Sequence, residues 1–183
     1  MTQVIMLNGP RTVGKNYIAD KFIEQADINT RMLPITWPMK LQAMAERNLT
    51  PSDVHVMEFA KDCKLARLGG LSPREVYIEF GTRMREQWGQ DYFANLWSMH
   101  ARAYTSYKLI VVPDARFQEE VDEACKEFGE HNVILVRVHR EDFGWRNDIG
   151  SYLKHWIAID FDNDAQSPDV GVLLHEKVRG LLL

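Results

Sequence analysis

The residues from Gly9 to Asn16, GPRTVGKN, limit what this chain can fold into more than any other stretch. They follow a short apolar run, Val4 to Leu7, and precede a helical pattern, which indicates a loop between a strand and a helix. In the motif G-x-x-x-x-G-K, backbone N–H groups and the helix N-terminus face a polyphosphate, and the lysine, here Lys15, reaches the outer phosphates. The sequence therefore predicts a phosphate-binding loop, and a glycine-rich turn without a ligand is the alternative.

The residue after the lysine departs from the usual form of this motif. A Ser or Thr normally binds magnesium there through its hydroxyl, whereas this chain has Asn16, followed by Tyr17. The amide oxygen of Asn16 could bind the ion or one of its waters. The motif is therefore a weakened match in which Asn16 is a candidate metal ligand.

Composition narrows the class of protein. A chain of 183 residues can bury the core of one domain, and its net charge of −4 offers no basic field for a nucleic-acid backbone. Its cysteines, Cys63 and Cys125, lack metal-ligand spacing, so we expect buried thiols in a reducing compartment. No basic leader and no run of membrane-spanning length is found. We expect a soluble cytoplasmic protein that binds no membrane and is unlike a general nucleic-acid-binding protein.

Short apolar runs alternate with helical patterns along the chain. The runs that indicate strands are Val4–Leu7, Met32–Thr36, Leu109–Pro113, Val133–Val136 and Trp156–Ile159. Helices are indicated over 118–128 and, at the end of the chain, over 168–183. This alternation predicts an α/β fold with a five-stranded, mostly parallel sheet and helices on both faces.

The segment of about 38–106 indicates a helical insertion between the second and third strands. Trp37-Pro-Met-Lys40 opens it just past a strand end, where ligands of open α/β sheets lie. Lys40 is therefore a candidate for contacting a second substrate, with a solvated lysine as the alternative. Ser72-Pro-Arg-Glu75 has the cap, proline and acidic first turn of a helix start. Gly81 interrupts that helical pattern, so we expect another group to approach closely there.

Asp114-Ala-Arg116 follows the most apolar run of the chain. A carboxylate at the tip of a strand beside the phosphate-loop strand can hold a magnesium-bound water or accept a hydrogen bond from a substrate hydroxyl. An arginine two residues later can bind a phosphate with both guanidinium arms. The alternative is that Asp114 caps a helix and that Arg116 is incidental.

Residues 137–153 are polar, have no strong periodicity and contain Arg137, Arg140 and Arg146. Arginines on a mobile segment can supply positive charge to a transferring phosphoryl group and help to exclude water. The pattern predicts an arginine-bearing lid over about 137–153, with solvated loop arginines as the alternative.

The order of these features resembles the phage-type deoxynucleoside monophosphate kinases, within the P-loop nucleoside monophosphate kinase superfamily. The resemblance extends along most of the chain. It rests on Gly14-Lys15, Trp37-Pro-Met-Lys40, Ser72-Pro-Arg-Glu before Phe80-Gly-Thr82, Val111-Val-Pro-Asp-Ala-Arg-Phe117 with Glu120, a strand ending at Arg137, and Asn163-Asp164. Two departures are Asn16, where the family often has an acidic residue, and 147–152, where it commonly has a His-x-Ser/Thr-Glu signature.

The resemblance implies a role for each matching residue. Those implied to bind ATP are Gly9, Arg11, Thr12, Val13, Gly14, Lys15, Asn16, Tyr17, Arg140, Asn163 and Asp164, the Asn-Asp pair bordering the adenine. Those implied to hold the acceptor are Trp37, Lys40, Arg74, Thr82, Arg85, Asp91 and Arg116. Those implied in catalysis are Lys15, Asp114, Arg116 and Arg137, with Asp114 at the site of the cofactor Mg²⁺. Asn16 is the second candidate metal ligand, from its position after the loop lysine.

Together these features predict a single P-loop kinase domain over 1–183 that phosphorylates deoxynucleoside 5′-monophosphates with ATP, in the host cytoplasm if phage-encoded. One alternative is a kinase that acts on a modified nucleotide or on hydroxymethylated bases in DNA, with a local basic face from Arg83, Arg85 and Arg102. Another is a regulator that binds ATP without phosphoryl transfer. The amphipathic helices of 41–99 also suggest a homodimer.

Overall fold

The computed structural model describes residues 1–145, 150–163, 167 and 169–182. This part of the chain contains a five-stranded sheet of order β2-β3-β1-β4-β5, in which every pairing is parallel. Its strands are β1 (Gln3–Asn8), β2 (Thr30–Met32), β3 (Leu109–Ala115), β4 (Val133–His139) and β5 (Ala158–Asp162). The predicted α/β class and five-stranded sheet are confirmed.

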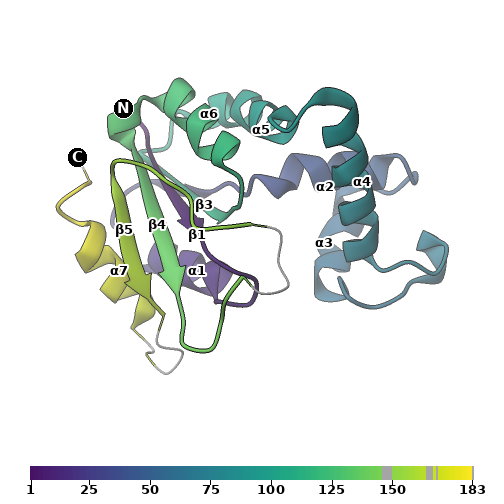
Figure 1. The fold of residues 1–183 in the computed structure, drawn as a ribbon, viewed down its shortest axis with the longest axis horizontal. Helices are drawn as coiled ribbons and strands as arrows, with labels where there is room; N and C mark the ends of the chain where they lie inside the picture. Colours follow the sequence, from purple (N-terminus) through teal and green to yellow (C-terminus); the bar gives the residue numbers. More distant parts are fainter. Residues whose placement is uncertain (146–149, 164–166, 168, 183) are drawn as a thin grey trace.

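Helices cover both faces of the sheet, which is why its central strands are apolar throughout (Figure 1). The covering helices are α1 (Lys15–Gln25), α5 (Tyr92–Ala101), α6 (Gln118–Phe128) and α7 (Val170–Val178). Ile5 and Leu7 of β1 belong to the core layer under α1 and α7, whereas Val4 and Met6 belong to the layer under α5 and α6. All four side chains are fully buried, so β1 anchors both layers.

Three helices form a lobe beside the sheet (Figure 1). They are α2 (Thr36–Ala45), α3 (Pro51–Phe59) and α4 (Pro73–Trp88), and they enclose a core of their own. Capping boxes at Thr50 and Ser72 start α3 and α4, so the predicted helix start at Ser72 is confirmed. Single 3-10 turns occupy Ala66–Leu68, Arg102–Tyr104 and Glu130–Asn132.

Helix α4 continues through Gly81 without a break. A Cβ at this position would lie 3.3 Å from Met39 Sδ of α2 and 3.4 Å from Arg85 Nη1. The expected close approach is confirmed: the glycine lets α2 and the Arg85 guanidinium lie against the backbone of α4. A glycine within a helix is about 1 kcal/mol less favourable than an alanine, and this packing accounts for its presence.

The second strand lies earlier than the pattern predicts. The prediction was 32–36, but β2 covers Thr30–Met32. Pro34 has no N–H for a strand ladder, and the N–H groups of Ile35 and Thr36 donate to the carboxylate of Asp114. Helix α2 therefore begins where the strand was predicted to end.

Differences also occur in the second half of the chain. Strand β4 runs to His139, so Arg137 belongs to the sheet and not to the predicted lid. Its register with β1 and β5 places Arg137 beside Asn8 and Asp160. Strand β5 begins two residues later than predicted, because the 60% exposed Trp156 lies outside the sheet and pairing with β4 starts at Ala158.

The ends of some predicted segments need similar correction. Helix α7 covers Val170–Val178, less than the predicted 168–183. Residues 146–149 of the predicted lid, Arg146 among them, lie outside the described residues. Of the two cysteines, Cys125 is half-buried and Cys63 is exposed, so the expectation of buried thiols is wrong for Cys63, which lies in a turn after α3.

Candidate functional site

Both glycines of the phosphate-loop motif are required by close contacts. A Cβ on Gly9, at the end of β1, would lie 2.6 Å from the carbonyl oxygen of Val138 on β4. Gly14 has φ 97°, and a Cβ there would lie 2.5 Å from Asn163 Nδ2. A side chain at either position would push the loop away from the edge of the sheet, so the sequence confines the loop to this path.

Asn163, the residue after β5, holds the loop in place through hydrogen bonds. Its Nδ2 donates to the carbonyl oxygen of Val13 at 2.6 Å, and its backbone N–H donates to the carbonyl oxygen of His139 at 2.7 Å. Asn163 is buried, with 6% of its surface exposed. Its amide therefore positions the loop, a role that the resemblance did not include.

The loop also contains a strained residue. Thr12 has φ 63°, a left-handed conformation that β-branched residues rarely adopt. Its hydroxyl donates to the carbonyl oxygen of Arg11 at 2.6 Å. Strain of this kind, on the order of 1–3 kcal/mol, is typically found at functional sites, where surrounding contacts hold it in place.

Lys15 is the first residue of α1, and its ammonium group lies across the loop. Its Nζ donates to the carbonyl oxygens of Gly9 and Pro10 at 2.6 and 2.8 Å. Helix α1 has no acidic residue in its first turn, so its positive end is not neutralised locally. The lysine and the helix end are positive groups of the kind that can bind an anion at the mouth of the loop.

A cavity of about 1030 Å³ joins this loop to the helical lobe. It is lined by the start of α1, the ends of β2 and β3, and the facing sides of α2, α3 and α4. The predicted site residues that line it are Arg11, Thr12, Gly14, Lys15, Asn16, Tyr17, Trp37, Lys40, Arg74, Thr82, Arg85, Asp114 and Arg116. The structure thus brings most of the predicted donor and acceptor residues to one cavity.

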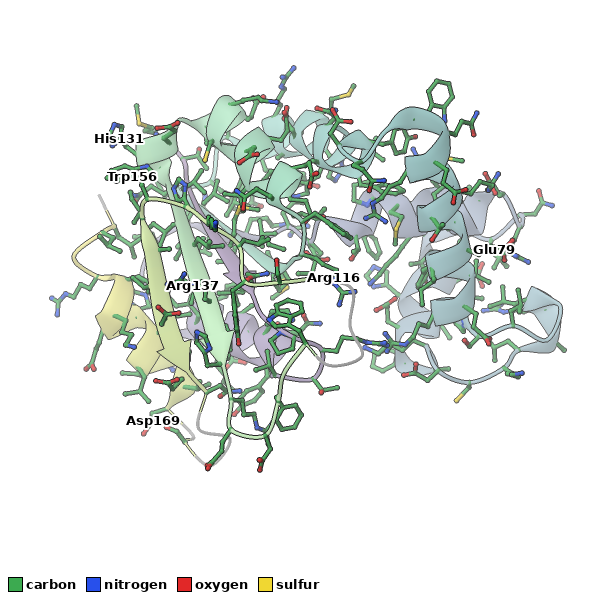
Figure 2. All side chains as sticks on the ribbon, in the orientation of Figure 1. Glu79, Arg116, His131, Arg137, Trp156 and Asp169 are labelled. Atoms are coloured by element: carbon green, nitrogen blue, oxygen red, sulfur yellow. The ribbon has the colours of Figure 1, made fainter. Side chains whose placement is uncertain are left out.

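Arg85 and Arg116 add positive charge to the wall of the cavity. The Arg85 guanidinium lies 4.4 Å from the ring centre of Phe117 and 4.9 Å from that of Phe93. Burial lowers its pKa, and Arg85 Nε has no hydrogen-bond partner among the described residues. Figure 2 shows Arg116 between the sheet and the helical lobe. An anion here would meet a desolvated, pre-oriented guanidinium.

Glu120, at the start of α6, supports this part of the wall. Its Oε2 accepts hydrogen bonds from the N–H groups of Arg116 and Phe117 at 2.6 and 3.0 Å. Burial raises the pKa of this carboxyl to about 7, against the opposing effect of the two N–H groups and of Arg85. Glu120 therefore fixes the turn that carries Arg116.

The carboxylate of Asp114 is largely engaged at the start of α2. Its Oδ1 accepts from the N–H of Ile35 at 2.8 Å, and its Oδ2 accepts from the N–H of Thr36 at 3.1 Å and from the Thr36 hydroxyl. A carboxylate has about four acceptor positions, of which three are thus filled. The helix-capping alternative for Asp114 is therefore present in the structure, while its side chain still lines the cavity.

Mg²⁺ commonly keeps several waters and binds one or two protein oxygens together with substrate phosphates. Among the described residues, no group of three or more His, Cys, Asp or Glu side chains is arranged to hold a metal ion. Asn16 lines the cavity next to Lys15, and Asp114 lines it from the end of β3. Both side chains carry oxygens of the kind that binds Mg²⁺, and Asp114 keeps one acceptor position open.

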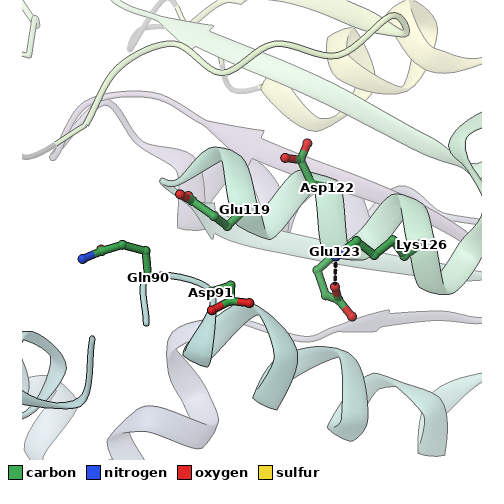
Figure 3. Close-up of a pocket in the computed structure, with 6 residues that line it drawn as sticks. All are labelled: Gln90, Asp91, Glu119, Asp122, Glu123 and Lys126. Atoms are coloured by element: carbon green, nitrogen blue, oxygen red, sulfur yellow. Dashed lines mark hydrogen bonds and ion pairs between the residues drawn. The ribbon is translucent and has the colours of Figure 1, made fainter. Parts of the chain in front are cut away.

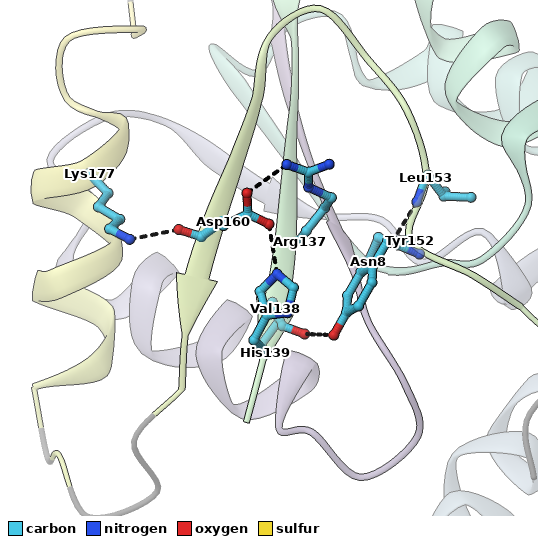
Figure 4. Close-up of polar contacts among 8 residues, drawn as sticks. All are labelled: Asn8, Arg137, Val138, His139, Tyr152, Leu153, Asp160 and Lys177. Atoms are coloured by element: carbon cyan, nitrogen blue, oxygen red, sulfur yellow. Dashed lines mark hydrogen bonds and ion pairs between the residues drawn. The ribbon is translucent and has the colours of Figure 1, made fainter. Parts of the chain in front are cut away.

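Of the predicted lid arginines, Arg137 and Arg140 lie outside the described lining of this cavity. Arg137 donates to Asp160 Oδ2 at 2.6 Å, and His139 Nε2 lies 2.7 Å from Asp160 Oδ1 (Figure 4). Arg140 lies 4.4 Å from the ring centre of Phe143. In this conformation the ion pair between Arg137 and Asp160 links β4 to β5.

Four further residues that were predicted to bind a ligand are absent from the described lining of the cavity, namely Gly9, Val13, Asp91 and Asn163. Asp91 lines a separate, acidic hollow of about 330 Å³ beside α6, together with Glu119 and Asp122 (Figure 3). There its Oδ2 accepts a hydrogen bond from Asn95 Nδ2 at 3.0 Å, which holds it at the start of α5. Asp164, predicted to border the adenine, lies outside the described residues.

Sequence reasoning missed several residues that line the cavity. They are Arg31, His55, Glu58, Tyr77, His100, Tyr104 and Phe117. Glu58 and Tyr77 lie on different helices, α3 and α4, and only the helical packing brings them together. A polar residue at a core-facing helical position is the signal that could have indicated them.

The sequence matches no family model, and no curated protein is significantly similar to it. Among the described helices, none combines the length and the apolar character that crossing a membrane would require.

Proposed function

We propose that this chain transfers the γ-phosphoryl group of ATP to a deoxynucleoside 5′-monophosphate and releases ADP and the diphosphate. The observation that carries the proposal is the single cavity that contains both Lys15 with its phosphate loop and the arginines Arg85 and Arg116. Two anion-binding positions facing one space are what a reaction between two phosphorylated substrates requires.

The phosphate loop would hold the donor. Its backbone N–H groups and the positive end of α1 would bind the phosphate chain, and Lys15 would neutralise the outer phosphate as it is transferred. Asn163 would keep the loop in this shape through its bond to the carbonyl of Val13. Thr12 and Gly14 supply the left-handed turns that the path needs.

The part of the cavity lined by Arg85 and Arg116 would hold the acceptor. Arg116 and Arg85 would bind the 5′-phosphate, and Glu120 would keep the Arg116 turn in place. The acceptor phosphate already has nucleophilic oxygens, so the protein needs to align the two substrates and neutralise their charge. Mg²⁺, when bound with ATP, would neutralise charge on the phosphate oxygens.

The test is turnover with ATP, Mg²⁺ and each common deoxynucleoside monophosphate, with 5-hydroxymethyl-dUMP added to the panel. We expect ADP and one deoxynucleoside diphosphate in equal amounts, and a rate about 100- to 1,000-fold lower for Lys15→Ala. Lys21→Ala is the matched control, because Lys21 lies on the same helix but pairs with Glu24 at 2.6 Å on the surface. It should retain the parental rate.

Absence of product with every monophosphate, despite ATP binding, would contradict the proposal. A regulator that binds ATP, or a kinase acting on bases in DNA, would then take its place. DNA binding with a steep salt dependence would favour the second of these.

A further inference from the structure

The part of the cavity wall formed by α2, α3 and α4 carries a cluster of three polar side chains in addition to Arg74 and Arg85. They are Lys40, Glu58 and Tyr77, here called the polar trio, and all three line the cavity. Lys40 Nζ donates to Glu58 Oε2 at 3.0 Å and lies 5.7 Å from the ring centre of Tyr77. One residue from each helix of the lobe thus meets in this cluster.

Two atoms of the polar trio are buried without a hydrogen bond. Tyr77 is 8% exposed, and neither its hydroxyl nor Glu58 Oε1 has a hydrogen-bond partner among the described residues. Burial and the nearby Glu58 raise the pKa of the Tyr77 hydroxyl, which therefore keeps its proton and can donate. Glu58 is also close enough to Tyr77 to act as its hydrogen-bond acceptor, so the two side chains can pair with each other. A ligand that enters the cavity can use the same acceptor and donor.

The charges of the polar trio favour an uncharged ligand. Lys40 and Glu58 neutralise each other, and both are partly shielded from solvent, at 20% and 32% side-chain exposure. The wall around Arg85 and Arg116, by contrast, carries two guanidinium groups suited to a phosphate. The trio would not attract a dianion, but it offers an acceptor at Glu58 and donors at Lys40 and Tyr77.

Aromatic rings lie next to this polar group. Trp37 and His55 contact each other with ring centres 4.9 Å apart, and both line the same cavity. Rings of this kind can stack on a flat heterocycle, while polar groups nearby bind its edge. A nucleobase combines a flat face with donors and acceptors side by side on one edge.

We propose that the polar trio recognises the nucleobase of the acceptor monophosphate, an inference that rests on the proposed function. Glu58 accepts a hydrogen bond from a ring or exocyclic N–H of the base. Lys40 and Tyr77 donate to a neighbouring ring nitrogen or carbonyl oxygen. The trio, and not the arginines, then determines which base is accepted.

The test compares base preference in Glu58→Gln, Tyr77→Phe and the parent enzyme, as kcat/KM for each deoxynucleoside monophosphate. We expect the ratio between the preferred base and the others to fall about 10- to 100-fold, with an unchanged KM for ATP. Glu79→Gln is the matched control, since Glu79 is an exposed residue of α4, outside the described lining, 3.9 Å from Arg47 (Figure 2). A purely structural role would lower kcat/KM equally for all bases and leave the ratios unchanged.

Equilibrium titration of the same monophosphates separates this inference from the proposed function. Suppose that the monophosphates bind base-selectively, that both substitutions weaken this binding, and that no turnover occurs. This result would contradict the proposed kinase activity but support base recognition by the polar trio. Turnover with unaltered base ratios would support the kinase and overturn the trio. Monophosphates that do not bind at all would overturn both.

Discussion

Because the carboxyl of Glu120 is buried, we predict that the free energy of unfolding depends on pH. In the folded protein, burial raises its pKa from the ordinary 4.5 to about 7. Below pH 4.5 the group is protonated in both the folded and the unfolded chain and does not affect stability. Between pH 4.5 and 7 the unfolded chain loses this proton while the folded protein keeps it, so the free energy of unfolding falls as pH rises. Above pH 7 the full loss is present.

The size of this effect follows from the difference between the two pKa values. At 1.36 kcal/mol per pH unit, it amounts to about 3 kcal/mol. Glu120→Gln keeps an oxygen that can accept from the N–H groups of Arg116 and Phe117, but it removes the titrating proton. The free energy of unfolding of the variant, relative to the parent, should therefore rise by about 3 kcal/mol between pH 4.5 and pH 8.

Urea unfolding curves at half-unit pH steps measure this difference, since contributions from other titrating groups cancel between parent and variant. Glu119→Gln removes the same charge from the neighbouring position, whose side chain lines the acidic hollow, and controls for the change in net charge. Parallel stability profiles for Glu120→Gln and the parent would refute the reasoning. Glu120 would then ionise like a solvated glutamate, and burial would not be what sets its pKa.

Two further predictions concern the cavity and the loop. Arg116→Ala should lower kcat about 100- to 1,000-fold in steady-state assays, while calorimetry should show an unchanged ATP affinity. Arg102→Ala, which removes a surface ion pair with Glu127, should change neither kcat nor ATP affinity. Parental turnover in Arg116→Ala would remove Arg116 from the mechanism. Thr12→Gly should raise the free energy of unfolding by up to about 1 kcal/mol, because relief of strain exceeds the added freedom of the unfolded chain. Gly14→Ala should lower it, and denaturant titrations in which both variants shift the same way would contradict the loop geometry.

The parts of the fold that depend on local sequence could be predicted. The loop between β1 and α1, the apolar strands β1, β3 and β4, and the helix start at Ser72 each follow from residues within one short stretch. The second strand could not be placed from its own residues. Its end is decided by Asp114, 78 positions from Thr36 along the chain, which captures the N–H groups that begin α2.

The candidate site shows the same limit. The loop motif predicted Lys15, and the position just after a strand end of a parallel sheet predicted Arg116. Arg137 follows the same rule, yet in the structure it pairs with Asp160 on the neighbouring strand. The polar trio depends on the packing of three helices, so no single helical pattern contains it. Side chains whose partners lie far along the chain are the ones that sequence patterns leave undetermined.

The proposed function requires one cavity to hold both substrates at once. Calorimetric titration with a bisubstrate ligand, an adenosine and a deoxynucleoside joined by five phosphates, tests it most directly. We predict one ligand per chain, bound at least about 100-fold more tightly than ATP, since the second contact becomes intramolecular. Arg116→Ala should remove most of that gain. A ligand that binds no more tightly than ATP, or at two sites per chain, would contradict the account.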